Sequence, residues 1–114
     1  MKITRLEECP KPAVEMEGAL HASRQVPIGK ADGAPNISIR VFTVEPGGHT
    51  PHHSHDSEHL NYVISGEGQV MEGETPRPVK QWDFVFVAPG EPHQYRNTGG
   101  QPLVFMCIVP SKYE

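Results

Sequence analysis

Apolar and polar residues alternate most clearly between residues 36 and 45, which read N-I-S-I-R-V-F-T-V-E. In a β-strand, neighbouring side chains point to opposite faces, so the odd-numbered and even-numbered residues of this segment lie on different faces. Arg40 shares its face with Phe42 and Val44. The pattern makes this segment the clearest strand that the sequence predicts.

Similar patterns predict further strands over 19–28, 68–73, 83–87 and 93–97. Residues 3–6 could form a short strand, and residues 103–109 are apolar on both faces, which indicates a well-covered strand. Pro46-Gly47-Gly48 is expected to be a turn, as is the polar segment with Pro76 and Pro78. The chain has no convincing apolar stripe at helical spacing, and its 12 prolines and 11 glycines are typical of short strands joined by turns. We therefore expect an all-β fold of eight to ten strands, with a double-sheet jelly-roll barrel whose inner positions line a cavity.

Size and charge exclude several classes of protein. The 114 residues are expected to form a single domain, 1–114, with one core. The formal net charge is −4 and no basic stripe is present, which argues against partners such as nucleic acid or an anionic membrane. No apolar run approaches the ~20 residues of a membrane span. The N-terminus lacks the apolar region of a signal peptide, and Cys9 and Cys107 occur in dissimilar contexts, so we expect two reduced thiols and a cytoplasmic location.

Histidines are concentrated in one stretch. Five of the seven lie between Gly47 and Gly66, and His93 lies further on. His53, His55 and His59 have the same parity, so a hairpin with its turn near residues 54–57 would bring them to one inner face, where His93 could join them. Neutral imidazole is the commonest side-chain metal ligand and suits zinc, copper, iron and nickel.

The histidine stretch resembles the first conserved motif of the cupins. It reads Gly47, five residues, His53-x-His55, three residues, His59, six residues, Gly66. Residues 82–97, W-D-F-V-F-V-A-P-G-E-P-H-Q-Y-R-N, are similar to the second cupin motif, with Asp83, Gly90, His93 and Asn97 in the matching places. His59 stands where most cupins have Glu, Trp82 replaces a Gly, and Pro89 is shifted by one residue. The resemblance is to small single-domain cupins with four histidine ligands, and it implies a double-stranded β-helix.

The resemblance implies one divalent transition metal in each chain: manganese, iron, nickel, zinc or copper. Its ligands would be His53, His55, His59 and His93. Glu58 competes for the third position because a carboxylate matches the metal's charge better, but its parity places it on the other face unless a bulge intervenes. His49 and His52 are expected to be exposed neighbours.

A substrate pocket beside the metal could include Arg40, Tyr95, Phe105 and Cys107. Arg40 could face the cavity and bind an anionic or oxygen-rich ligand, or it could lie on the outer face of the sheet. Tyr95 has the parity of His93. The sequence leaves open whether Phe105 and Cys107, or the intervening residues of that strand, face inward. Trp82 is expected to have a packing role, and Asn97 to cap a turn.

Two functions follow from this pattern. The first is a metal-dependent enzyme, such as a dioxygenase or an isomerase, in which the metal would activate oxygen or act as a Lewis acid. No side chain is assigned as catalytic. The second is a non-enzymatic module that binds a small-molecule ligand or a metal. In both cases we expect a homodimer, as the resemblance to small cupins and the two-faced apolar strands suggest.

Overall fold

The computed structural model describes all residues from 1 to 114 and consists almost entirely of antiparallel strands. Three single-turn 3-10 helices accompany them, η1 (Leu6–Glu8), η2 (Lys30–Asp32) and η3 (Ser111–Tyr113). The strands are β1 (Leu20–Ile28), β2 (Ile37–His49), β3 (His59–Ser65), β4 (Glu67–Glu72), β5 (Thr75–Lys80), β6 (Phe84–Val87), β7 (His93–Arg96) and β8 (Leu103–Pro110). The prediction of an all-β fold is confirmed.

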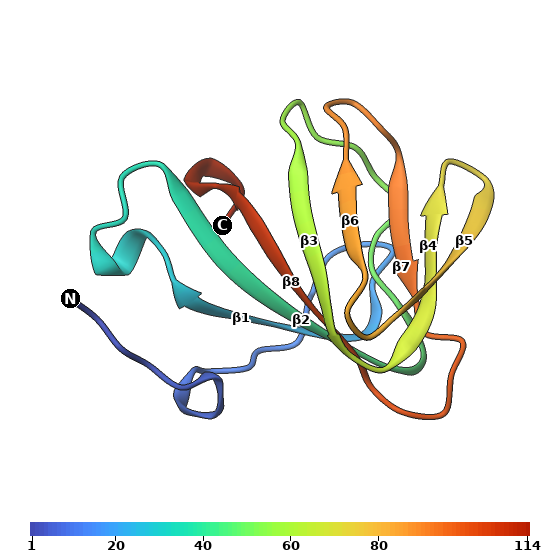
Figure 1. Cartoon of the computed structure of the whole chain (residues 1–114), viewed down its shortest axis with the longest axis horizontal. Helices are drawn as coiled ribbons and strands as arrows, with labels where there is room; N and C mark the ends of the chain where they lie inside the picture. The colour runs from blue at the N-terminus through green and yellow to red at the C-terminus, as the bar shows by residue number, and fades with distance from the viewer.

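The strands form one strongly curled sheet in the order β5-β4-β7-β2-β8-β3-β6, and β1 pairs with β2. Figure 1 shows β1, β2 and β8 crossing the molecule and the shorter strands curving round beside them. β2 is the central element because it pairs with β1, β7 and β8. None of the helices has the length and apolar character needed to cross a membrane.

The turn predicted at Pro46-Gly47-Gly48 is wrong, because β2 continues through these residues to His49. Gly47 has a φ of +80°, a conformation that glycine adopts without strain. The backbone of Gly48 passes so close to the carbonyl oxygens of Leu20 and His21 that a Cβ would not fit there. The two glycines therefore let a single strand bend and keep its pairing.

Two other expectations about elements are also wrong. The residues predicted as a short N-terminal strand, 3–6, lie outside any strand. The polar segment with Pro76 and Pro78 is the edge strand β5, in which the two prolines face Met71 and Gln69 of β4. Prolines two residues apart point their missing N–H groups in the same direction, away from β4. An edge strand tolerates this because it needs donors on only one side.

The core lies inside the curled sheet, where even-numbered residues of β2 meet odd-numbered residues of β8. Phe42 stacks on Phe105 with ring centroids 5.3 Å apart, and Tyr95 of β7 stacks on the other side of Phe105 at 3.9 Å. Burial of each such side chain stabilises the fold by about 1.5–3 kcal/mol. Trp82 lies outside this core: its side chain is 69 % exposed in the turn before β6, with its ring 6.2 Å from that of Tyr62.

Candidate metal centre

The histidine segment connects β2 to β3, but it does not form the predicted hairpin. Instead, His53 pairs with His93 at the start of β7, through hydrogen bonds of 3.2 and 2.9 Å between their backbone groups. His59 begins β3 and lies opposite Val87 of β6. The segment therefore finds its backbone partners on β7, and a distant strand, not a local turn, brings the histidines together.

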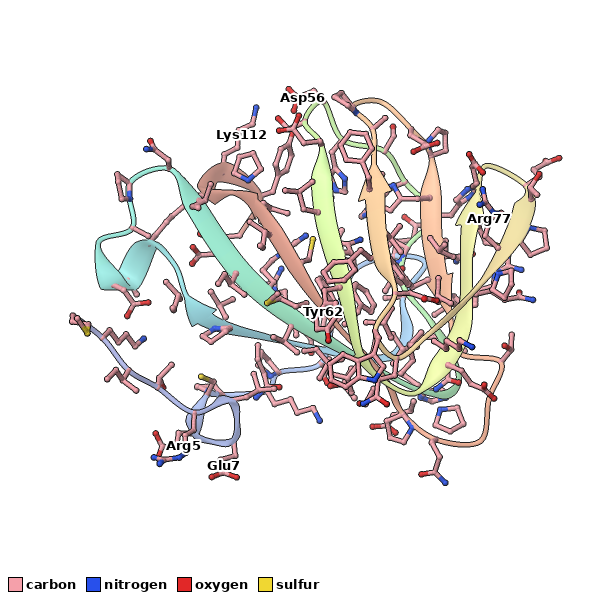
Figure 2. All side chains as sticks on the ribbon, in the orientation of Figure 1. Arg5, Glu7, Asp56, Tyr62, Arg77 and Lys112 are labelled. Atoms are coloured by element: carbon pink, nitrogen blue, oxygen red, sulfur yellow. The ribbon has the colours of Figure 1, made fainter.

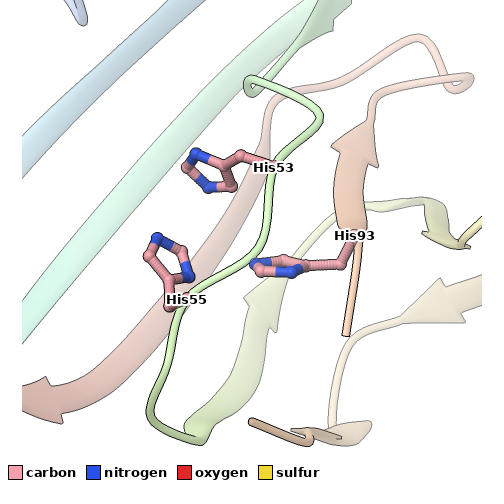
Figure 3. A group of neighbouring side chains, drawn as sticks. All are labelled: His53, His55 and His93. Atoms are coloured by element: carbon pink, nitrogen blue, oxygen red, sulfur yellow. The ribbon is translucent and has the colours of Figure 1, made fainter. Parts of the chain in front are cut away.

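Three imidazoles form a compact group. One ring nitrogen from each of His53, His55 and His93 lies within 4.8 Å of the others. Figure 3 shows His53 and His55 extending from the loop and His93 meeting them from β7. His59 lies outside this group of nitrogens, but its ring stacks on that of His55 with centroids 4.0 Å apart. All four rings line the same cavity.

The protein environment keeps these histidines neutral. Burial, with smaller effects of the neighbouring imidazoles and Arg40, lowers the pKa of His55 to about 4 and that of His59 to about 3. Burial also lowers the pKa of His53 and of His93. A neutral imidazole has a free lone pair on one ring nitrogen, which is the form that binds a metal.

A hydrogen bond fixes how one of the rings presents that lone pair. Nδ1 of His93 lies 2.9 Å from the carbonyl oxygen of Glu91, so Nδ1–H donates and Nε2 carries the lone pair. Nδ1 of His59 lies 3.7 Å from the Cys107 sulfur. Nε2 of His59 and Nδ1 of His55 are buried without any hydrogen-bond partner. An unpaired buried polar atom costs about 1–3 kcal/mol, and a cation bound by these imidazoles would offset part of that cost, so the residues fit a metal ion.

The cavity beside the histidines has a volume of about 50 Å³ and is rich in cationic and aromatic groups. Arg40 and Arg24 line it, and no Asp or Glu does. The Arg40 guanidinium donates to the carbonyl oxygen of Tyr113 at 2.9 Å and approaches the Cys107 sulfur at 3.5 Å, while its Nε has no partner. Of the two positions that the sequence allowed for Arg40, the structure has the inward one.

The other three suggested pocket residues also line the cavity, so the inner face of β8 is the face with Phe105 and Cys107. The hydroxyl of Tyr95 accepts a hydrogen bond of 2.8 Å from Asn61, and burial raises the pKa of this tyrosine. Burial raises the pKa of the Cys107 thiol as well, against an opposing effect of Arg40. Both groups therefore stay protonated at neutral pH.

Some residues of the site were not singled out from the sequence. The ring of Tyr113 in η3 lies 5.0 Å from that of His55 and 5.6 Å from that of His59. No sequence signal places Tyr113 there, since it follows Pro110 at the end of the last strand. Asn61 could have been found, because it has the parity of His59 in the same strand. Glu58 and His52 are exposed, whereas His49 is partly buried beside Gln94.

Comparison with known proteins identifies relatives of this fold. Residues 40–109 match the family described as "Cupin domain". The chain is 32 % identical over 71 residues to 1-methylthio-D-xylulose 5-phosphate methylsulfurylase of Rhodospirillum rubrum, a match covering 62 % of this chain and 46 % of that protein. It is 32 % identical over 65 residues to the oxalate-binding protein of Thermotoga maritima, covering 56 % of this chain and 54 % of that protein. The chain thus spans about half the length of these relatives.

A solved structure extends the likeness to nearly the whole chain. The polyketide cyclase RemF of Streptomyces resistomycificus superposes with a TM-score of 0.92 and is 28 % identical, over 97 % of this chain and 80 % of that one. The predicted jelly-roll fold is confirmed by this agreement.

Proposed function

This chain belongs to the cupin family, and on that basis we propose that it is a metal-dependent enzyme that acts on a small anionic or chelating oxygen compound. The observation that carries the proposal is the pair of buried imidazole nitrogens without partners, on His55 and His59, in a cavity that contains arginine and no carboxylate.

The proposed ligands are His53, His55, His59 and His93, with one divalent metal in each chain. Nitrogen-only ligation favours nickel, copper, zinc or iron, and manganese is compatible where it is abundant. When bound, the metal would supply a Lewis acid or a site for oxygen activation. Metal analysis of protein purified without added metal or a histidine tag tests this step: less than one metal in ten chains would contradict it.

The residues around the histidines define the substrate class. Arg40 is buried and has a free Nε, so it can bind and orient an anionic oxygen. The Tyr95 hydroxyl accepts from Asn61 and keeps its own proton, which it can donate to a ligand atom. A cavity of about 50 Å³ admits only a few atoms beside the metal, since one water occupies about 30 Å³ of liquid.

The proposed reaction is an oxygenation or an isomerisation at the metal, without an amino-acid nucleophile. Cys107 is the only cysteine in the cavity, and its raised pKa keeps it as a neutral thiol. Enolate-forming, diketone and alkene compounds should therefore be screened with oxygen-consumption and product assays. Turnover should stop with a chelator and persist in Cys107→Ser. Turnover that resists chelation, or that is lost in a metal-loaded Cys107→Ser protein, would contradict the mechanism.

A second candidate is a metal-dependent module that binds a small ligand without turnover. It is favoured by the lack of a carboxylate base in the cavity and by the 32 % identity to an oxalate-binding protein. Titration calorimetry of the metal-loaded protein with oxalate distinguishes the two: tight, chelator-sensitive binding together with silence in the substrate screen would favour this candidate.

The proposal includes assembly as a homodimer in the cytoplasm. The two cysteines are free, as expected in a reducing compartment. A net charge of −4 argues against a nucleic-acid partner.

A further inference from the structure

Two arginines on neighbouring strands form one wall of the histidine cavity. Arg24 of β1 and Arg40 of β2 both line it. Arg24 lies opposite Phe42 in the β1–β2 pair, and Arg40 lies two residues before Phe42, so the three side chains share one face of the sheet. The Arg40 guanidinium lies over the Phe42 ring, 4.9 Å from its centroid. The strand register therefore directs two guanidinium groups toward the same space.

Neither arginine has an acidic side chain as its partner. Arg40 donates a hydrogen bond of 2.9 Å to the carbonyl oxygen of Tyr113, and Arg24 donates one of 3.3 Å to the main-chain oxygen of Glu114. The carboxylate of Glu114 accepts hydrogen bonds from other groups, among them the Ser38 hydroxyl. The salt bridges of the chain involve different residues: Lys2–Asp32, Arg77–Glu72 and Lys112–Asp56.

The cavity has no negative charge that would balance the two arginines. No Asp or Glu lines it, and its histidines are neutral because burial lowers their pKa. Glu15 and Glu17, in the adjoining N-terminal segment, are exposed and lie outside the lining. Arg40 is only 8 % exposed, and a buried charge without a charged partner is costly. A carboxylate makes stronger hydrogen bonds to guanidinium than a carbonyl does, so the cavity favours an anionic ligand.

The two arginines lie at different depths. Arg40 is buried, and its guanidinium approaches the Cys107 sulfur at 3.5 Å. Arg24 is partly exposed, and one hydrogen bond occupies only one of the five N–H groups of its side chain. Val14 and the exposed Met16 line the cavity together with Arg24. Arg24 therefore stands at the solvent side of the cavity with donors to spare.

We propose that the cavity binds a small dicarboxylate whose two carboxylates are separated by a short carbon chain, one lying beside Arg40 and the histidines and the other at Arg24. Diagonal neighbours in a sheet, as these two arginines are, lie about 7–8 Å apart, which a short chain can span. This inference rests on the proposed function, because it takes the histidine cavity as the ligand site. It adds Arg24 as the residue that selects for the second charge.

Binding of matched acids tests the proposal. Malonate, succinate and glutarate are each compared with the monocarboxylate of the same chain length, namely propionate, butyrate and valerate, by titration calorimetry on protein freed of metal with a chelating resin. In at least one pair the dicarboxylate should bind about tenfold more tightly or better, because its second carboxylate gains charge-assisted hydrogen bonds to Arg24. Arg24→Gln should reduce this ratio to near one, and Arg24→Lys should keep part of it because the charge is retained.

Arg5→Gln is the matched control, because it removes the same charge from a residue that does not line the cavity. Figure 2 shows Arg5 on the N-terminal segment, far from Asp56 of the histidine loop. This variant should keep the full preference for the dicarboxylate, and a cooperative thermal transition checks that Arg24→Gln is folded. Equal affinities within every pair of acids for the unaltered protein, or an undiminished preference in Arg24→Gln, would overturn the proposal.

These outcomes are distinct from those that test the proposed function, since the titrations contain no metal and require no turnover. A protein that takes up no metal but shows the Arg24-dependent preference would contradict the metal-dependent enzyme and support this inference. A metal-loaded, active protein whose metal-free form has no such preference would do the reverse.

Discussion

The histidine cluster depends on several residues that are not histidines. The Glu91 carbonyl accepts a hydrogen bond from His93 and so fixes which ring nitrogen of His93 carries the proton, and the Cys107 sulfur lies beside the Nδ1 of His59. Thr50 accepts a hydrogen bond from the backbone of Tyr95 and so ties the histidine loop to β7. Arg40 contributes the permanent positive charge that lowers the pKa of all four imidazoles. The chemistry of the site is therefore set by the neighbours of the four rings as much as by the rings.

Removal of a single proposed ligand should lower metal binding sharply. Replacement of His53, His55, His59 or His93 by Ala removes one nitrogen donor, so metal content after dialysis should fall at least tenfold. His52→Ala is the matched control, because His52 is exposed in the same loop and should keep full occupancy. Full metal content in His59→Ala, combined with loss in Glu58→Ala, would show that Glu58 is the third ligand.

Arg40 should determine affinity for anions. Hydrogen bonds to charged groups contribute about 1.5–3 kcal/mol, so Arg40→Gln should weaken binding of oxalate to the metal-loaded protein roughly tenfold to a hundredfold. Arg77→Gln should have no effect, since Arg77 is exposed on β5 and pairs with Glu72. Calorimetry measures both, and an unchanged affinity in Arg40→Gln would contradict the assigned role.

At the scale of elements, the tight connections between strands decide where the barrel can close. Gly66 joins β3 to β4 with a φ of +82°. A Cβ at this position would collide with the backbone of Pro102 and Leu103, just before β8. Gly66 therefore serves both as a turn residue and as the point where two strands approach each other.

Gly66→Ala should be considerably more destabilising than Gly73→Ala. Both glycines have positive φ, which costs an alanine about 1–2 kcal/mol, but a Cβ at Gly73 meets nothing within 4 Å. Gly73→Ala should therefore show only the conformational cost, and Gly66→Ala that cost plus the collision. Urea denaturation measures the free energies of unfolding, and equal losses in the two variants would contradict this explanation.

The C-terminal turn η3 is held near the candidate site by Glu114. The Ser38 hydroxyl and the Lys30 N–H donate hydrogen bonds to the Glu114 carboxylate, and they lower its pKa from the usual 4.5. Because the folded state favours the charged form, this stabilisation is complete well above pH 4.5 and is lost as the pH falls through the lowered pKa.

Glu114→Gln should consequently destabilise the protein at pH 7 but make little difference in acid. Thermal unfolding at pH 7 and at several values below pH 4.5 measures this difference against the unaltered protein. Glu74→Gln is the control. Glu74 is exposed in the β4–β5 turn, so this substitution should change the stability neither at pH 7 nor in acid. A loss of stability in Glu114→Gln that persists or grows in acid would contradict this explanation.

For the molecule as a whole, metal binding and folding should be linked. In the metal-free protein, two unpaired buried nitrogens lower the free energy of unfolding, and a bound metal would offset this loss. At a free metal concentration of 100 times Kd, binding adds about 2.7 kcal/mol to the free energy of unfolding. For a domain of 114 residues this corresponds to a rise in Tm of roughly 10 °C. Scanning calorimetry with metal and with chelator measures the rise, which should be absent in His53→Ala.

The sequence alone determined the all-β class, most of the strands and the grouping of the histidines. It could do so because strand periodicity depends only on neighbouring residues, and because the spacing of Gly47, His53, His55 and Gly66 is a local property of one segment. The parity of Tyr95 with His93, and of Cys107 with Phe105, placed them on common faces in the same way.

Tertiary structure decided the features that depend on which strands become neighbours. The pairing of His53 with His93 replaced the predicted hairpin because β7 offered the histidine loop a backbone partner. Arg40 points inward because the sheet curls around the face of β2 on which Arg40 lies. Alternation alone does not show which face of a strand lies in the interior. The exposure of Trp82 and the strand at Pro76 and Pro78 arose because β5 and β6 lie at the two edges of the sheet, where one side of each strand has no partner.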